Sequence, residues 1–217
     1  NRIIQYSEDE SKLLINYVIR TSIKPILFVE GISDVDILKT AYKKLYPDED
    51  MPILVQDAFD RGFIKILMSR DELFVNYPDK WFFSLFDFDK AYEDWRDLGG
   101  NIEITDIEKG MCRKKDGKKA YAFMLPIPNN KLKKQVWNDD NPVEKIISNP
   151  HFTIEHIFWN KTSLASWFIK DEKSGFIRFK GDKHKVKFAK DIVPTLDESC
   201  FKPFRPMFEF IKKTIGN

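Results

Sequence analysis

The chain is poor in cysteine and in long apolar runs. Its two cysteines among 217 residues, Cys112 and Cys200, are too few to indicate a disulfide scaffold. The longest apolar runs, such as 26–29 and 82–86, fall far short of the roughly 18 to 20 residues that cross a bilayer, so no membrane partner is expected. The first residues carry no charged and apolar leader. These absences favour a cytoplasmic protein in a reducing compartment.

Net charge is also nearly absent, because 36 Lys and Arg residues face 34 Asp and Glu residues. The charges are nevertheless unevenly distributed along the chain. Residues 87–108 hold eight acidic and two basic residues, whereas 109–134 hold nine basic residues and one acid, and 170–190 hold eight and three. An acidic block between basic ones suits a protein that holds metal ions beside a phosphate backbone. Solvated loops and helix faces are the alternative reading of each charge run.

The first half of the chain alternates between apolar strands and amphipathic helices. A capping box at Ser7 and Glu10 precedes a helix to about Arg20, with Leu13, Leu14, Tyr17 and Val18 on one face. Strands are then predicted at 26–29, 53–55 and 81–86, with helices capped by Ser33 and Asp36, at 63–75, and up to Leu98. Such alternation predicts an α/β fold with a mainly parallel sheet flanked by helices.

After Gly100 the pattern changes. Residues 101–108 and 119–125 alternate like two paired strands of a hairpin, joined by a basic segment with Asp116-Gly117 at its turn. Helices are predicted at 153–160, 163–170, 183–192 and 203–213. We therefore divide the chain into an N-terminal helix at 1–23, a core at 24–125 and a helical C-terminal elaboration at 126–217.

Two acidic motifs follow predicted strands. Glu30-Gly31-x-x-Asp34 follows the first strand, and Asp87-x-Asp89 follows the strand ending at Phe86. Ligands of open α/β sheets bind at the carboxyl ends of the strands, and residues two apart on an extended chain share a face. Converging carboxylates need a cation, and an all-oxygen ligand set suits Mg²⁺ or Mn²⁺. Each motif alone has a simpler reading as a set of helix-capping acids.

In this arrangement residues 24–125 resemble the TOPRIM domain of topoisomerases, primases and certain nucleases. The chain looks most like the nuclease type of OLD-family and related bacterial anti-phage defence proteins. The resemblance implies a Rossmann-like core in which Glu30 is the family's glutamate, Asp87 and Asp89 are its metal-binding pair, and Asp34 is the extra acid of the nucleases. It also implies a later acid and a later lysine, for which Glu155 and Lys185 are the candidates, with Lys187 as the competing lysine.

Alternatives remain for the later residues, since Thr153-x-Glu155 is also an ordinary helix cap and a lysine in a basic helix is usually solvated. The three histidines lack zinc-ligand spacing. Trp159 and Trp167 offer either base-stacking faces or core packing. No Gly-x-x-x-x-Gly-Lys-Ser/Thr motif occurs, so an ATPase or sensor would be a separate partner or another part of the gene product.

The leading hypothesis is a Mg²⁺- or Mn²⁺-dependent endonuclease acting on DNA, RNA or tRNA, in which Glu30, Asp87, Asp89 and Lys185 are catalytic, and Asp34 and Glu155 are further metal ligands. Basic residues would grip the phosphate backbone, namely Arg113, Lys114, Lys115, Lys118, Lys119, Lys183 and Lys187. The alternative is a non-catalytic TOPRIM-like scaffold. A primase or topoisomerase would need a zinc module or a tyrosine nucleophile, for which only Tyr92 and Tyr121 stand as candidates. An inhibitory partner or homo-oligomer is expected to restrain the activity.

Overall fold

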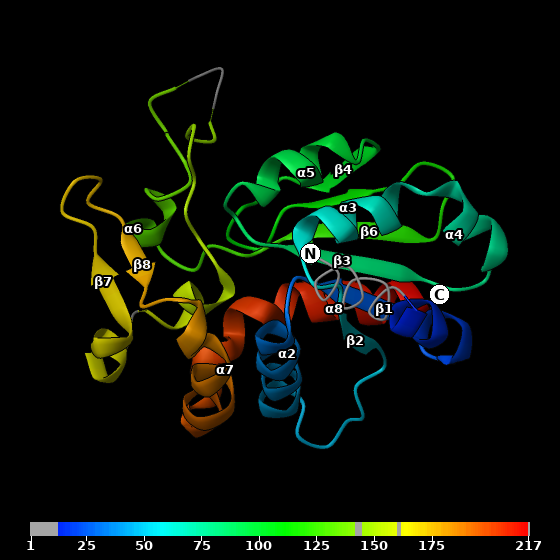
Figure 1. Cartoon of the computed structure of the whole chain (residues 1–217), viewed down its shortest axis with the longest axis horizontal. Helices are drawn as coiled ribbons and strands as arrows, with labels where there is room; N and C mark the ends of the chain where they lie inside the picture. Colours follow the sequence, from blue (N-terminus) through cyan, green and yellow to red (C-terminus); the bar gives the residue numbers. More distant parts are fainter. Residues whose placement is uncertain (1–12, 142–144, 160–161, 217) are drawn as a thin grey trace, which may run out of the picture.

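The computed structural model describes residues 13–141, 145–159 and 162–216. Its centre is a six-stranded sheet of order β2-β1-β3-β6-β5-β4 (Figure 1). Four strands run parallel, namely β2 (Leu54–Asp57), β1 (Ile26–Val29), β3 (Phe82–Phe86) and β6 (Ala120–Met124). The remaining strands are β5 (Cys112–Lys114) and β4 (Asn101–Ile104), and β5 pairs antiparallel with both of its neighbours, β6 and β4. The predicted α/β fold with a mostly parallel sheet is therefore confirmed.

Helices cover both faces of this sheet. The helices α2 (Ile32–Leu45) and α8 (Arg205–Gly216) pack on one face, where the Tyr42 and Phe208 rings meet edge to face at 5.2 Å. The other face carries α3 (Arg61–Ser69), α4 (Asp71–Asn76) and α5 (Ala91–Asp97) (Figure 1). Every residue of β1 and β3 is buried. This double burial explains why both strands are continuous apolar runs.

The N-terminal helix is described from residue 13 to residue 21. Its inward face consists of Ile15 and Ile19, which are four apart and almost fully buried. The predicted apolar face was wrong, because Leu13, Leu14 and Tyr17 are all more than half exposed. The Ser7–Glu10 capping box lies outside the described residues.

Among the described residues, no helix combines the length and the apolar character that crossing a membrane requires.

Two further elements differ from the prediction. The single helix expected at 63–75 is two helices, α3 and α4, because Arg70 between them has an extended backbone with φ −78° and ψ 120°. The two strands expected at 101–108 and 119–125 do not pair with each other, since β5 lies between β4 and β6. The Asp116-Gly117 turn instead joins β5 to β6. Strand β5 was not predicted, because its basic sequence resembles an exposed loop, yet its Cys112 and Arg113 are both buried.

The C-terminal third is less regularly helical than expected. It contains α6 (Asn130–Lys133), the short 3₁₀ helices η1 (Ile154–Phe158) and η2 (Thr162–Trp167), and the hairpin of β7 (Phe168–Lys170) and β8 (Ile177–Phe179). The helix predicted at 163–170 was thus wrong in its second half, where Phe168 and Phe179 pair in the hairpin and share an aromatic contact.

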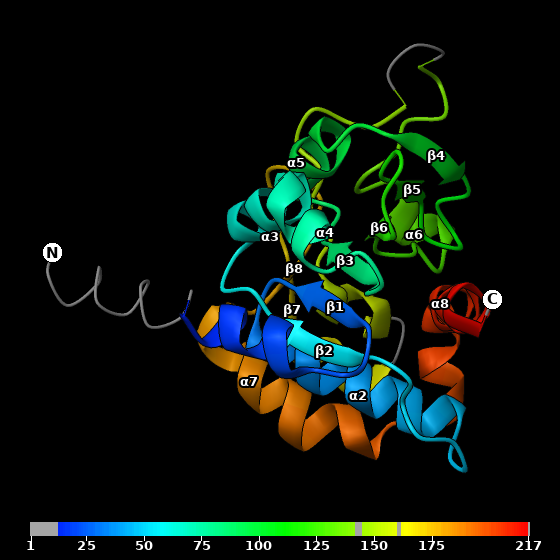
Figure 2. The ribbon, with the colours of Figure 1, turned by 90° about the vertical axis from the view of Figure 1, so that its right-hand side faces the viewer.

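A winding helical segment then leads into α8 and passes beneath α2 (Figure 2). It consists of η3 (Asp182–His184), α7 (Lys185–Lys187), the π-helical turn η4 (Phe188–Ile192), η5 (Val193–Thr195) and η6 (Glu198–Phe204). This segment brings Lys185, far along the sequence, next to the carboxyl edge of the sheet.

Candidate functional site

The two predicted acidic motifs meet at the carboxyl edge of the sheet. Glu30 follows β1 and Asp87 follows β3, and these strands are parallel neighbours. The Glu30 Oε1 atom accepts a hydrogen bond from the backbone N–H of Asp87 at 3.4 Å, across 57 residues of sequence. The Asp87 side chain is nearly buried. The parallel pairing of two apolar strands therefore suffices to bring these two carboxylates together.

Asp34 joins them from the first turn of α2. Its Oδ2 accepts from the backbone N–H of Gly31 at 3.0 Å, and the Ser33 hydroxyl donates to its Oδ1 at 3.3 Å. The helix therefore begins at Ile32, and the predicted Ser33–Asp36 cap is replaced by contacts of Asp34. Asp34 is 8% exposed and is held in place by its own loop.

The C-terminal elaboration contributes the fourth acid. An isolated antiparallel bridge joins Phe88 to Phe152, and the backbone N–H of Ile154 donates to Asp87 Oδ1 at 3.2 Å. The next residue, Glu155, is completely buried. Its Oε2 accepts from the Thr153 hydroxyl at 2.5 Å, while its Oε1 is buried without a hydrogen bond in the described structure.

A lysine faces this buried carboxylate. The Lys185 Nζ lies 3.9 Å from Glu155 Oε1, and its side chain is 27% exposed. Lys187, the competing lysine, is exposed, so the structure places Lys185 and not Lys187 against Glu155.

His156 holds the turn that contains Thr153 and Glu155, because its Nδ1 accepts from the Thr153 N–H at 2.9 Å and its Nε2 then donates to the Ile177 carbonyl at 3.0 Å. His156 is thus a buried support.

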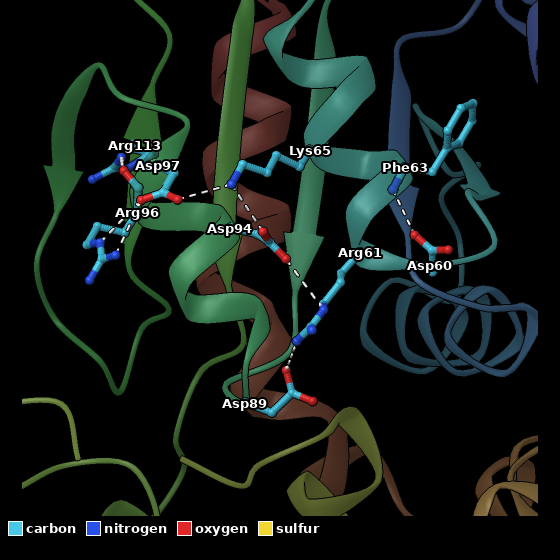
Figure 3. Close-up of polar contacts among 9 residues, drawn as sticks. All are labelled: Asp60, Arg61, Phe63, Lys65, Asp89, Asp94, Arg96, Asp97 and Arg113. Atoms are coloured by element: carbon cyan, nitrogen blue, oxygen red, sulfur yellow. Dashed lines mark hydrogen bonds and ion pairs between the residues drawn. The ribbon is translucent and has the colours of Figure 1, made fainter. Parts of the chain in front are cut away.

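Asp89 lies at the open side of the group. Its Oδ1 accepts from the backbone N–H of Ala91 at 2.7 Å, so the helix-capping reading holds for this oxygen. The same atom lies 3.9 Å from Nη1 of Arg61, which also pairs with Asp94 through Nε at 3.4 Å (Figure 3). The Asp89 side chain is 30% exposed.

The acids shift one another's protonation. Burial, followed by the charges of Asp89 and Asp34, raises the pKa of Glu30 to about 8. Burial, followed by the charge of Glu155, raises the pKa of Asp34 to about 7. Burial and then Glu30 raise the pKa of Asp87 well above its ordinary value. Interactions of this kind link all five predicted acids into one cluster, defined here as Glu30, Asp34, Asp87, Asp89 and Glu155.

The same acidic charges stabilise the protonated form of Lys185. Burial alone would lower the pKa of Lys185, but the charges of Glu155, Asp87 and Asp34 together raise it above its ordinary value, so Lys185 stays protonated. Arg61 acts on the opposite side and lowers the pKa of Glu30. Five carboxylic acids thus share two nearby cations, and this excess of oxygen donors is typical of a site for a hard divalent cation.

Whether a divalent cation suits the cluster depends on the ligand atoms that its side chains offer. The cluster offers oxygen atoms only, and the buried Glu155 Oε1, which faces Lys185 at 3.9 Å, has no hydrogen bond in the described structure and is free to act as a metal ligand. In residues 13–141, 145–159 and 162–216, no three Asp, Glu, His or Cys side chains are already gathered closely enough to hold an ion as they stand. The donor chemistry therefore fits Mg²⁺ or Mn²⁺, with side-chain adjustment on binding.

Arg61 lies beside the cluster but was not among the predicted site residues. It stands at the first position of α3, after the short turn that follows the carboxyl end of β2. The available signal was its position: Arg61 follows β2, the parallel neighbour of β1, and β1 is the strand that Glu30 directly follows.

The predicted nucleic-acid-binding residues divide into two groups. Lys183 and Lys187 are exposed and flank Lys185. Lys114, Lys115, Lys118 and Lys119 instead precede or flank the start of β6, which lies at the amino ends of β1 and β3. Strands of this length separate the two edges of the sheet by about 16 Å. The second group therefore does not reach a phosphate held at the acidic cluster.

Arg113 is a correction, because it is buried rather than free to bind a backbone phosphate. Its guanidinium lies over the Trp95 ring at 4.2 Å and donates to the carbonyl oxygens of Gly99 and Arg96, and Figure 3 shows Arg113 beside Arg96. The residue is 7% exposed. It ties β5 to the end of α5 and serves the fold.

We expect Arg113→Met to lower the free energy of unfolding by about 1–3 kcal/mol, because it leaves two carbonyl groups unpaired and removes the contact with Trp95. Urea denaturation measures this. Lys119→Met is the matched control, since the Lys119 side chain makes surface contacts only, an ion pair with the fully exposed Asp79 and a contact with the Trp81 ring at 6.0 Å. Equal effects of the two substitutions would contradict the structural role of Arg113.

The remaining aromatic candidates are mostly packed. Trp167 stacks on Phe179 at 6.2 Å, as the packing interpretation predicted. Tyr121 is buried and stacks on Trp81 and Phe83, so it is not presented as a nucleophile.

A pocket of about 700 Å³ borders Asp89 and extends past Tyr92 to Trp137 and Lys145. Of the acidic cluster, only Asp89 lines this pocket.

Comparison of the chain with protein-family models, with curated protein sequences and with solved structures found no match.

Proposed function

We propose that this protein is a metal-dependent nuclease of the TOPRIM type, hydrolysing phosphodiester bonds in nucleic acid. One observation carries the proposal: carboxylates from separate parts of the chain gather in a nearly buried group at the carboxyl edge of a parallel sheet, with a protonated lysine against it. Buried acids that raise one another's pKa destabilise the metal-free fold, which favours a role in binding a cation. The order of Glu30 after β1 and Asp87-x-Asp89 after β3 supports the TOPRIM assignment.

Each residue has a distinct task in this proposal. Glu30, Asp34, Asp87, Asp89 and Glu155 would hold one or two Mg²⁺ or Mn²⁺ ions, with Glu30, Asp87 and Asp89 nearest the reaction. Bound there, such an ion supplies an activated water and stabilises the leaving oxygen. Lys185, protonated and partly exposed, neutralises charge that develops on the phosphate. Thr153 and His156 keep Glu155 oriented.

The substrate side of the site is basic and open. Lys183 and Lys187 lie on either side of Lys185 in sequence and are exposed, so they are suited to contact flanking phosphates. The pocket beside Asp89 adds Lys90, Arg96 and Lys145 to the approach. Binding through such contacts is expected to weaken steeply with salt.

The biological role that fits this activity is that of an effector in a bacterial anti-phage defence system. A nuclease without restraint harms its host, so we propose control by a separate ATPase or sensor protein, or by self-association. The isolated chain is then expected to act weakly until its partner is added.

The decisive experiment incubates the protein with plasmid DNA, single-stranded DNA and tRNA, in Mg²⁺, Mn²⁺ or EDTA. We expect at least one substrate to be cut with a divalent ion, none in EDTA, and none by Glu30→Ala. Cleavage by Glu30→Ala equal to wild type would show that the cluster is not the active site. Metal binding without cleavage of any of the three substrates would favour the non-catalytic scaffold.

A further inference from the structure

The turn between β2 and α3 contains an unusual backbone. Phe59 has φ 70°, and it is the one non-glycine residue with positive φ among those that the structure describes. The N–H of Asp60 donates to the carbonyl of Ala58 at 2.9 Å, which closes a three-residue γ-turn centred on Phe59. This positive-φ γ-turn is rare and strained for a residue with a side chain.

The turn is held in place from both sides. Ala58 is fully buried, and its N–H donates at 2.8 Å to the carbonyl of Val29, the residue just before Glu30. On the other side, Asp60 caps α3 by accepting from the Phe63 N–H at 2.8 Å (Figure 3). Strand β1 and helix α3 therefore impose the conformation on Phe59.

Burial of the ring does not offset this strain. The side chain of Phe59 leaves the residue 49% exposed, whereas glycine adopts the same backbone without steric penalty. An aromatic ring retained on the surface at a position that favours glycine is consistent with a role in binding. Its ring is a stacking surface that an unpaired nucleobase can use.

Arg61 stands two residues further on and reaches the acidic cluster. Its guanidinium lies 3.9 Å from Asp89 and 3.4 Å from Asp94, and the side chain is 35% exposed (Figure 3). A partly exposed guanidinium beside the proposed metal ligands is placed to donate hydrogen bonds to a phosphate bound at the site.

We propose that residues 58–61 form a substrate-binding turn for single-stranded nucleic acid, in which Phe59 stacks on an unpaired base and Arg61 holds an adjacent phosphate. This inference rests on the proposed nuclease function and adds a preference for unpaired strands. The strained backbone presents the ring at the edge of the sheet that carries Glu30. Phe59 and Arg61 are thus binding residues, distinct from the metal-holding acids.

The test separates stability from binding. Phe59→Gly relieves the backbone and removes the ring, so we expect its melting temperature to rise by about 2–4 °C. Its affinity for a fluorescein-labelled single-stranded oligonucleotide, measured by anisotropy in EDTA, is expected to fall about 10-fold. Phe59→Trp keeps an aromatic face and is expected to recover the affinity. Binding of a fully paired duplex is expected to be unaffected by Phe59→Gly.

Lys65 provides the matched control for Arg61. Lys65 lies one helical turn after Arg61 on α3. It pairs with Asp94 at 3.2 Å and with Asp97 at 3.0 Å, but not with Asp89 (Figure 3). We expect Arg61→Ala to weaken binding about 10-fold and to reduce the salt slope by about one, and Lys65→Ala to change neither.

Two outcomes would overturn the inference: Phe59→Gly binding the single strand as tightly as wild type, or Lys65→Ala costing as much affinity as Arg61→Ala. If wild type cleaves nucleic acid and Phe59→Gly is unaffected, this inference alone fails. If wild type neither binds nor cleaves nucleic acid, the proposed function itself fails and takes this inference with it.

Discussion

Asp87→Asn is expected to reduce cleavage by at least about 10²- to 10³-fold while making the metal-free protein more stable. Asparagine keeps a side-chain oxygen for the Ile154 N–H, which donates to Asp87 Oδ1 at 3.2 Å, so the local fold is retained. It removes a buried acid whose pKa is raised by burial and by Glu30. We expect a gain of about 1–2 kcal/mol in the free energy of unfolding without metal.

The two readouts are a cleavage assay and denaturation in EDTA. Asp36→Asn is the control, because Asp36 is a partly buried acid on the same helix as Asp34 and pairs loosely with Lys190 at 4.0 Å. It is expected to leave cleavage unchanged. Loss of activity together with loss of stability in Asp87→Asn would indicate a structural role instead, and retained activity would remove Asp87 from the site.

The second large effect is an inverted dependence of stability on pH and metal. The pKa of Glu30 rises from 4.5 to about 8 on folding, and that of Asp34 rises from 3.8 to about 7. The folded state therefore binds these protons more tightly than the unfolded state. Their contribution to stability is present at low pH and is lost as pH rises toward the folded-state values.

We expect the metal-free protein to be about 1–3 kcal/mol more stable near pH 6 than near pH 8, measured by urea denaturation in EDTA. Adding Mg²⁺ or Mn²⁺ should restore stability near pH 8, since an ion that binds only the folded state stabilises it. The ion should have less effect near pH 6, where protons compete. The Glu30→Gln, Asp34→Asn double variant is expected to weaken both dependences, leaving the part that buried Asp87 contributes. Stability that increases from pH 6 to pH 8 in EDTA would contradict the buried acidic cluster.

The parts of the site that follow from short-range sequence pattern were predictable. Apolar runs ending in Glu30 and in Asp87-x-Asp89 predicted two buried strands with acids at their carboxyl ends. Once those strands are parallel neighbours, their ends coincide, and so the contact between Glu30 and the Asp87 N–H was foreseeable. The placement of Glu155 and Lys185 was also anticipated, but from the family resemblance rather than from periodicity.

Other features depended on contacts between distant residues. Arg113 lies in a run of basic residues typical of an exposed loop, yet it is buried over Trp95 because β5 inserts between β4 and β6. No local pattern distinguishes a lysine or arginine that binds carbonyl groups from one in solvent. The hairpin of β7 and β8 was missed for a similar reason, since three-residue strands carry little periodic signal.

The amino-acid sequence by itself determined the alternation of strands and helices, and with it the edge of the sheet where Glu30 and Asp87 lie, because buried parallel strands are apolar and both acids directly follow such strands. Only the tertiary structure decided which cations face those acids and which basic residues lie far from them. Lys185 reaches Glu155, and Arg61 reaches Asp89, through the path of the chain around α2 and α3. Such pairings depend on distances in space, which the spacing of residues along the chain does not encode.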